Sequence, residues 1–122
     1  MSIQNKIINI INVILLVSIL TLSAYAHAAD NTAVVNIKSI ELRDTAHHAI
    51  FVNGAVPFEG CDLSDRAILI ENVGSGRAML GTAMLALGAD KKVTIRVDGC
   101  TEINPGQTTL TAPRAVKMQI YK

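Results

Sequence analysis

The chain has 122 residues, 50% of them hydrophobic, and its 11 basic and 10 acidic residues leave a formal net charge of +1. This length predicts a single small domain. The balanced charge argues against a general nucleic-acid binder, whose affinity requires surplus Lys and Arg facing phosphates.

The first residues have the three parts of a secretory signal peptide. One basic residue, Lys6, precedes an almost purely apolar run at 7–22, and small residues follow at 23–29. The apolar run is shorter than the ~20 residues that a membrane-spanning helix needs. We therefore expect removal of a signal peptide at 1–28, with cleavage after Ala26 as the alternative, and one domain at 29–122 with no stable membrane insertion.

Export determines how the two cysteines are interpreted. The predicted location is the periplasm or the extracellular space, where disulfides persist. Cys61 and Cys100 are therefore expected to pair with each other. A redox-active or metal-binding thiol pair is the alternative, but no C-x-x-C spacing or accompanying His motif supports it.

Three strands are predicted in the first half of this domain. The segment 33–42 is rich in β-branched residues, and its apolar spacing slips between Ile37 and Ile40, which predicts a bulge or bend. A second strand at 47–52 ends at the Asn53-Gly54 turn signal. A loop at 57–65 holds Cys61 and leads into a third strand at 66–73.

A helix is predicted at 77–87, with Ser75 as its N-cap and Gly88 as the glycine that ends it. Its apolar stripe is expected to consist of three large residues flanked by three others: Leu80, Met84 and Leu87, flanked by Met79, Ala83 and Ala86. The helix has no acidic residue, so most of its surface is expected to be covered.

Two alternating segments predict the last strands, at 92–98 and 115–121, separated by a turn at 104–106. The order is three strands, a helix and two strands. This is the element order of the OB-fold, a five-stranded Greek-key β-barrel whose helix lies between strands 3 and 4. The predicted class is therefore mainly β, a small barrel with its helix plugging one end.

The segment 83–97 and the residues after it resemble the subtilase-cytotoxin-type binding subunits and related small exported bacterial proteins. In these proteins an A-x-x-x-G-K-x-V-x-I run is followed by a Cys and by a final I-x-x-I-x-I/L strand. The corresponding pieces here are Cys100 and the segment 116–120, and 37–40 fits the first strand of those proteins. The resemblance covers most of the domain in layout and is specific across about fifteen residues.

The resemblance implies an OB-fold subunit that forms a ring of five copies, binds cell-surface glycans and accompanies a catalytic toxin subunit. No glycan-binding residue is carried over, because no matching motif for one is present. Sugar sites usually stack rings on aromatic side chains, and the predicted domain offers Phe51, Phe58 and Tyr121 but no Trp.

Three clusters of polar or charged residues are candidate sites. His47 and His48 are adjacent in a predicted strand, so their rings should point to opposite faces and an exposed strand position is favoured over a shared metal. The 74–77 segment is interpreted as a strand-to-helix connection rather than an anion site. Glu59, Asp62 and Asp65 lack regular calcium-ligand spacing, and turn formation is favoured.

These observations predict a protein that is not an enzyme and needs no metal or cofactor. Its expected function is that of a toxin-type receptor- or glycan-binding subunit, and the alternative is an accessory or structural protein that binds a protein partner. A ligand surface is placed near Phe51, Arg96 and Tyr121. A homopentamer interface is placed on small residues of the helix: Ala78, Gly81, Ala83 and Ala86.

Overall fold

Five strands and one helix make up the part of the chain that the computed structural model describes, which is Lys6 and residues 31–122. The predicted signal peptide otherwise lies outside the described residues. The strands and the helix are β1 at Thr32–Glu41, β2 at His47–Asn53, β3 at Arg66–Ile70, α2 at Gly76–Gly88, β4 at Lys92–Glu102 and β5 at Thr111–Ile120. Within these residues no helix is long and apolar enough to cross a membrane.

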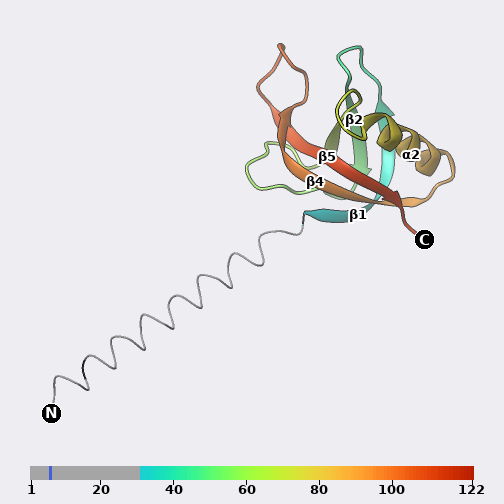
Figure 1. Ribbon diagram of the computed structural model, residues 1–122, viewed down its shortest axis with the longest axis horizontal. Coiled ribbons are helices and arrows are strands. Elements are labelled where there is room, and N and C mark those ends of the chain that lie inside the picture. The colour runs from blue at the N-terminus through green and yellow to red at the C-terminus, as the bar shows by residue number, and fades with distance from the viewer. Residues whose placement is uncertain (1–5, 7–30) are drawn as a thin grey trace. The chain divides into compact units, whose positions relative to one another are not determined.

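The strands form a mixed sheet that closes in a ring in the order β1-β2-β3-β5-β4 (Figure 1). The pairs β1–β2, β1–β4, β2–β3 and β4–β5 are antiparallel, and β3 pairs with β5 in parallel at a single position, Ile68 with Arg114. The sequence prediction of a mainly β domain with one helix between the third and fourth strands is confirmed at this level. A ring of strands leaves few unpaired edges.

The predicted irregularity in the first strand is confirmed. The register of β1 against β2 shifts between Ile37 and Ser39, so Lys38 is the extra residue. A bulge increases local bending and twist, and this one lets the N-terminal half of β1 pair with β4 and its C-terminal half pair with β2.

The alternating segment at 93–97 has the buried and the outer face that its sequence predicts. Val93, Ile95 and Val97 are buried in the main core cluster, together with residues of all five strands and α2. Thr94, between them, pairs with Gln119 on the outer face. Burying each of these aliphatic side chains stabilises the fold by about 1.5–3 kcal/mol.

Three strand boundaries differ from those expected. β3 ends at Ile70 instead of residue 73, because Val73 N–H bonds back to the Ile70 carbonyl in a turn. β4 continues past Gly99 to Glu102, and β5 starts at Thr111 instead of residue 115. The two strands remain paired beyond their expected ends because a register shift between Val97 and Cys100 absorbs the glycine.

The helix differs from expectation at both ends. Ser75 occupies the N-cap position, but its side chain makes no capping hydrogen bond. The chain leaves the helix after Gly88 through Ala89, and the left-handed residue is Asp90, with φ of 52°. Lys91 N–H then bonds to the Ala86 carbonyl, which satisfies a terminal group of the helix.

The buried stripe of α2 is Met79, Ala83 and Ala86, the flanking part of the expected apolar face. Leu80 is partly buried against the core, whereas Met84 and Leu87 are exposed. Alanines on this stripe let the helix axis approach the sheet closely, and the larger side chains are displaced to its flanks. The expectation that most of the helix surface is covered is therefore wrong, because Met84, Leu85 and Leu87 are exposed.

The predicted disulfide is present between Cys61 and Cys100, which lie 39 residues apart with a Cα–Cα distance of 5.4 Å. It ties the 54–65 loop to β4. A second small cluster of buried residues lies under this loop, where Leu63 covers Ile68 and Ala112. The disulfide therefore helps to hold this loop over the second cluster.

Candidate functional site

The three residues placed in a ligand surface are spread around the ring. Phe51 lies opposite Ser39 of β1, and Arg96 lies opposite Thr32 of the same strand. Those β1 positions are about 23 Å apart at ~3.3 Å per residue. Tyr121 follows β5 and is exposed, and its backbone bonds to Lys92 at the far end of β4 from the disulfide. The structure does not bring the three side chains together.

Phe51 instead belongs to a small polar and aromatic arrangement on β2 and β3. The Arg66 guanidinium carbon lies 4.4 Å from the centre of the Phe51 ring. The same guanidinium donates to both carboxylate oxygens of Asp65, at 2.8 and 3.1 Å. One face of the ring is therefore covered by a cation that is already paired, which leaves that face unavailable for stacking on a sugar.

The side-chain hydrogen bond from Arg66 lowers the pKa of Asp65 below its ordinary value of 3.8. Because the folded-state pKa is the lower one, the pair contributes stability that is present above pH 3.8 and lost as the pH falls through the folded value. The carboxylate is exposed, so this contribution is small.

In a carboxyl NMR titration, R66A is expected to raise the Asp65 pKa toward 3.8, whereas R77A should leave it unchanged. An ordinary Asp65 pKa in the unmodified protein would contradict this assignment.

His48 was expected in an exposed position, and it is buried instead. Its Nδ1 accepts a hydrogen bond from the Arg43 backbone N–H at 2.9 Å, so that nitrogen carries no proton. Its Nε2 lies 2.7 Å from Glu71 Oε2 and therefore donates to it. Arg43 in turn donates through its guanidinium to the Ile103 carbonyl. The imidazole thus links the loops that hold Arg43 and Glu71, and Arg43 extends the link to Ile103. This is a structural role that uses both ring nitrogens.

The acidic cluster near Cys61 has structural partners as well. Asp62 Oδ2 accepts from the backbone N–H of Thr111 at 2.9 Å and from its hydroxyl at 3.0 Å, which holds the 54–65 loop against the start of β5. Asp65 is paired with Arg66. Within the described residues no group of three or more His, Cys, Asp or Glu side chains could hold a metal ion.

The small residues that were placed in an oligomer interface are divided between two environments. Ala83 and Ala86 are fully buried against the sheet, so neither can contact another molecule. Ala78 and Gly81 are exposed. The prediction of an oligomer interface therefore still applies to Ala78 and Gly81.

A surface that the sequence analysis missed lies beside the helix and is here called the α2–β1 surface. It consists of Ile40, Leu42, Met84 and Leu87. All four line one open cavity of about 300 Å³ between α2 and the end of β1. Leu42 and Met84 are 58% and 52% exposed. From Ala78 to Gly88 the helix has no charged side chain, which was the available sign in the sequence.

Comparison of this chain with protein-family models, with curated proteins and with solved structures found no match.

Proposed function

We propose that this protein is an exported, non-catalytic binding protein whose copies assemble through the α2–β1 surface. The observation that carries the proposal is the group of exposed apolar side chains at this surface, led by Leu42 and Met84. Single exposed aliphatic residues are common, but a contiguous apolar group with a polar rim is typical of an interaction site.

Further copies of the same chain are the occupant that the charges favour. The segments that continue from this surface contain both signs, Glu41 after Ile40 and Asp90 and Lys91 after the helix. Two copies can therefore place cations beside anions around an apolar centre. The exposed Gly81 permits a close approach of the helix to a neighbour.

We propose that the ring of strands is an OB-type Greek-key barrel. The strand order β1-β2-β3-β5-β4, with a parallel contact between β3 and β5 and a helix between β3 and β4, supports this assignment. The disulfide supports export, because such bonds persist in oxidising compartments. The periplasm and the extracellular space both satisfy this condition.

The function proposed for the assembly is recognition of a cell surface, as a toxin-type receptor- or glycan-binding subunit. The assembly is proposed to be the homopentamer that the resemblance implies and to carry a partner toxin subunit. Weak sugar binding becomes strong when several copies engage together, so assembly and ligand recognition are linked in this proposal. It involves neither nucleic acid nor a cofactor.

The second candidate is an accessory protein that binds one protein partner as a monomer. The aromatic side chains favour it over a sugar site. Phe58 packs against the main core, and the Arg66 guanidinium covers a face of Phe51. Tyr121, by contrast, is exposed. A screen of the purified protein on a glycan array separates the two candidates, because only the first predicts glycan binding that increases with the number of linked copies.

Substitution of Leu42 and Leu87 by Glu is expected to dissociate the assembly, because burying a carboxylate without a partner costs several kcal/mol. T109E is the matched control, since it adds a carboxylate at an exposed position of the 103–110 loop, distant in sequence from β1 and α2. Sedimentation velocity of the oxidised protein, isolated after export, measures the outcome. An unchanged sedimentation coefficient for the Leu42 and Leu87 variants would reject this surface as the interface.

A further inference from the structure

β5 has an open edge on the side opposite β4. It pairs with β3 only at Arg114, and β3 ends at Ile70, where the chain turns toward α2. On the β4 side, Tyr121 N–H bonds to the Lys92 carbonyl at 2.8 Å, which marks a hydrogen-bonded pair of the ladder. Such pairs alternate along an antiparallel ladder. Met118 and Ile120 therefore direct their backbone N–H and C=O groups away from β4, toward this edge.

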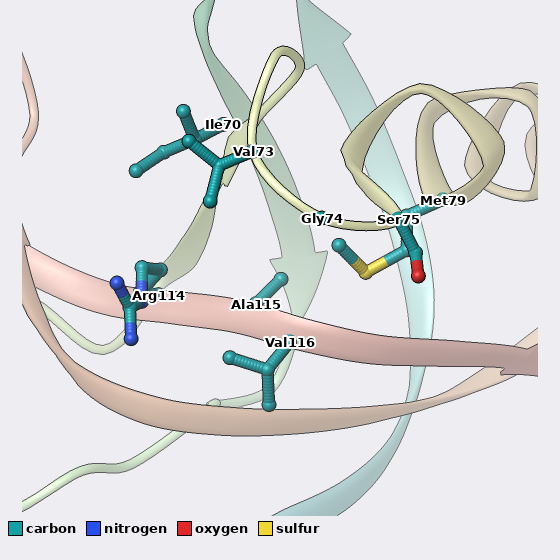
Figure 2. A pocket seen from close by; sticks show the side chains of 8 residues that line it. All are labelled: Ile70, Val73, Gly74, Ser75, Met79, Arg114, Ala115 and Val116. Atoms are coloured by element: carbon teal, nitrogen blue, oxygen red, sulfur yellow. The ribbon is translucent and has the colours of Figure 1, made fainter.

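A groove follows the open edge. One open cavity of about 260 Å³ lies between the 70–75 segment and residues 114–116 of β5 (Figure 2). A second, of about 210 Å³, lies between α2 and residues 116–119. Both are lined by Ser75, Met79 and Val116, so they form one continuous depression, here called the β5 groove. In Figure 2, Val73 lies across the gap from Arg114 and Val116.

The lining of the β5 groove suits an extended chain. The α2 wall consists of short side chains, Ala78 and Thr82, and the buried Met79 contributes an apolar floor. β5 contributes backbone groups at alternate positions. A strand added to a sheet edge obtains its affinity from the backbone bonds and its specificity from alternate side chains.

The charges on β5 indicate which chain would fit. Arg114 lines one end of the groove, where its Nε donates to the Asp98 backbone carbonyl at 3.3 Å, and Lys117 lines the part beside α2. Neither has a carboxylate partner within the described residues. Glu71, the nearby carboxylate, is bonded to His48 and lies 3.7 Å from Arg77. The available charge along the groove is therefore positive.

We propose that the β5 groove binds an extended segment of a partner protein in which apolar and acidic residues alternate, as an added strand beside β5. Its backbone pairs with Met118 and Ile120, its apolar side chains face Met79, and its carboxylates reach Arg114 and Lys117. A second copy of β5 is disfavoured as the occupant, because two like edges would place Lys117 across from the same cations. The β5 groove lies on the opposite flank of α2 from the α2–β1 surface, so this proposal is independent of assembly.

The test uses two labelled eight-residue peptides, one alternating valine with glutamate and one alternating valine with lysine, in fluorescence anisotropy with the oxidised full-length gene product. The acidic peptide is expected to bind at least tenfold more tightly than the basic one. K117E should weaken acidic-peptide binding about tenfold by reversing a charge, and A78Y should abolish it by filling the groove. K38E, a charge reversal at the β1 bulge, should leave the affinity unchanged.

Amide hydrogen exchange locates the peptide. Saturation with the acidic peptide is expected to slow exchange at Met118 and Ile120 at least tenfold, because their N–H groups become bonded. Equal binding of the two peptides, unchanged affinity in K117E or A78Y, or protection confined to other residues would overturn the proposal. The proposal would also be overturned if the Met118 and Ile120 amides were protected without peptide and lost that protection on dilution. A second copy of the chain would then occupy the groove.

Discussion

Removal of the Cys61–Cys100 disulfide is expected to lower the free energy of unfolding by about 4 kcal/mol, the value that the chain-entropy model gives for a loop of 39 residues. A small domain has about 5–15 kcal/mol in total, so this loss is a large fraction of the stability. The disulfide also holds the 54–65 loop, whose Leu63 covers the buried Ile68 and Ala112. Loosening this loop exposes those side chains to water.

Urea unfolding followed by circular dichroism measures this effect in three samples: the oxidised protein, the reduced protein and the C61S/C100S double variant. In thermal unfolding of the same samples, the melting temperature of the last two should fall by roughly 15–30 °C, given about 4–8 °C per kcal/mol for a domain of this size. The double variant separates loss of the covalent bond from effects of the reductant itself. Equal urea midpoints for the oxidised and bond-free forms would show that the loop is held by its other contacts, such as the Asp62–Thr111 bonds.

Substitution of Gly76 by Ala is expected to destabilise the fold by about 1–3 kcal/mol, because the added methyl group has no space and overpacking is costly. A Cβ at this position would contact the Ile70 carbonyl oxygen and lie 2.8 Å from that of Glu71. Both are backbone atoms at the end of β3, so they cannot move aside without shifting the strand or the helix. The close approach at Gly76 sets where α2 begins, and hence the width of the β5 groove.

G81A is the matched control for that substitution. Gly81 lies in the same helix, and a Cβ there would meet nothing within 4 Å. Replacing a helix-interior glycine by alanine should stabilise the protein by about 0.5–1 kcal/mol. Thermal unfolding of the two variants should therefore move in opposite directions. If G76A were as stable as G81A, the start of α2 would not be constrained by β3 in the way described.

The sequence predicted those features of the fold that depend on local patterns. Alternation at 93–97 identified an inner and an outer face, and the slip between Ile37 and Ile40 identified the bulge. Export and the pairing of two cysteines led to the disulfide. Each of these inferences needs only residues near one another in the chain, or the count of one residue type.

The features that it missed depend on contacts between distant segments. Periodicity predicted the broad apolar face of α2 that includes Met79, Ala83 and Ala86, but it cannot tell which part of that face is buried. Close packing on the ring selects the stripe with Ala83 and Ala86. His48 is buried because Arg43 and Glu71, from two different loops, supply its partners. Strand pairing with β5 likewise extends β4 through Gly99, although that glycine signals a turn.

The candidate site was likewise predictable where it depends on local patterns and not where it depends on contacts between distant segments. Alternation correctly placed Arg96 on the exposed side of its strand. It contains no information on how neighbouring strands pair, and the pairing of β2 and β4 with β1 separates Phe51 from Arg96. The α2–β1 surface was identified only when the structure showed Leu42 and Leu87 lining one cavity. Its single sign in the sequence was the absence of charged residues in the helix after Arg77.

Copies of this protein are proposed to cover the α2–β1 surface of one another. The most direct test is the molar mass of the oxidised, exported protein, measured by light scattering on a size-exclusion column at several concentrations. We expect a particle of several chains, and about five if the toxin-type subunit proposal is correct. A particle with the mass of one chain at every concentration would contradict the claim and leave the accessory-protein function in its place.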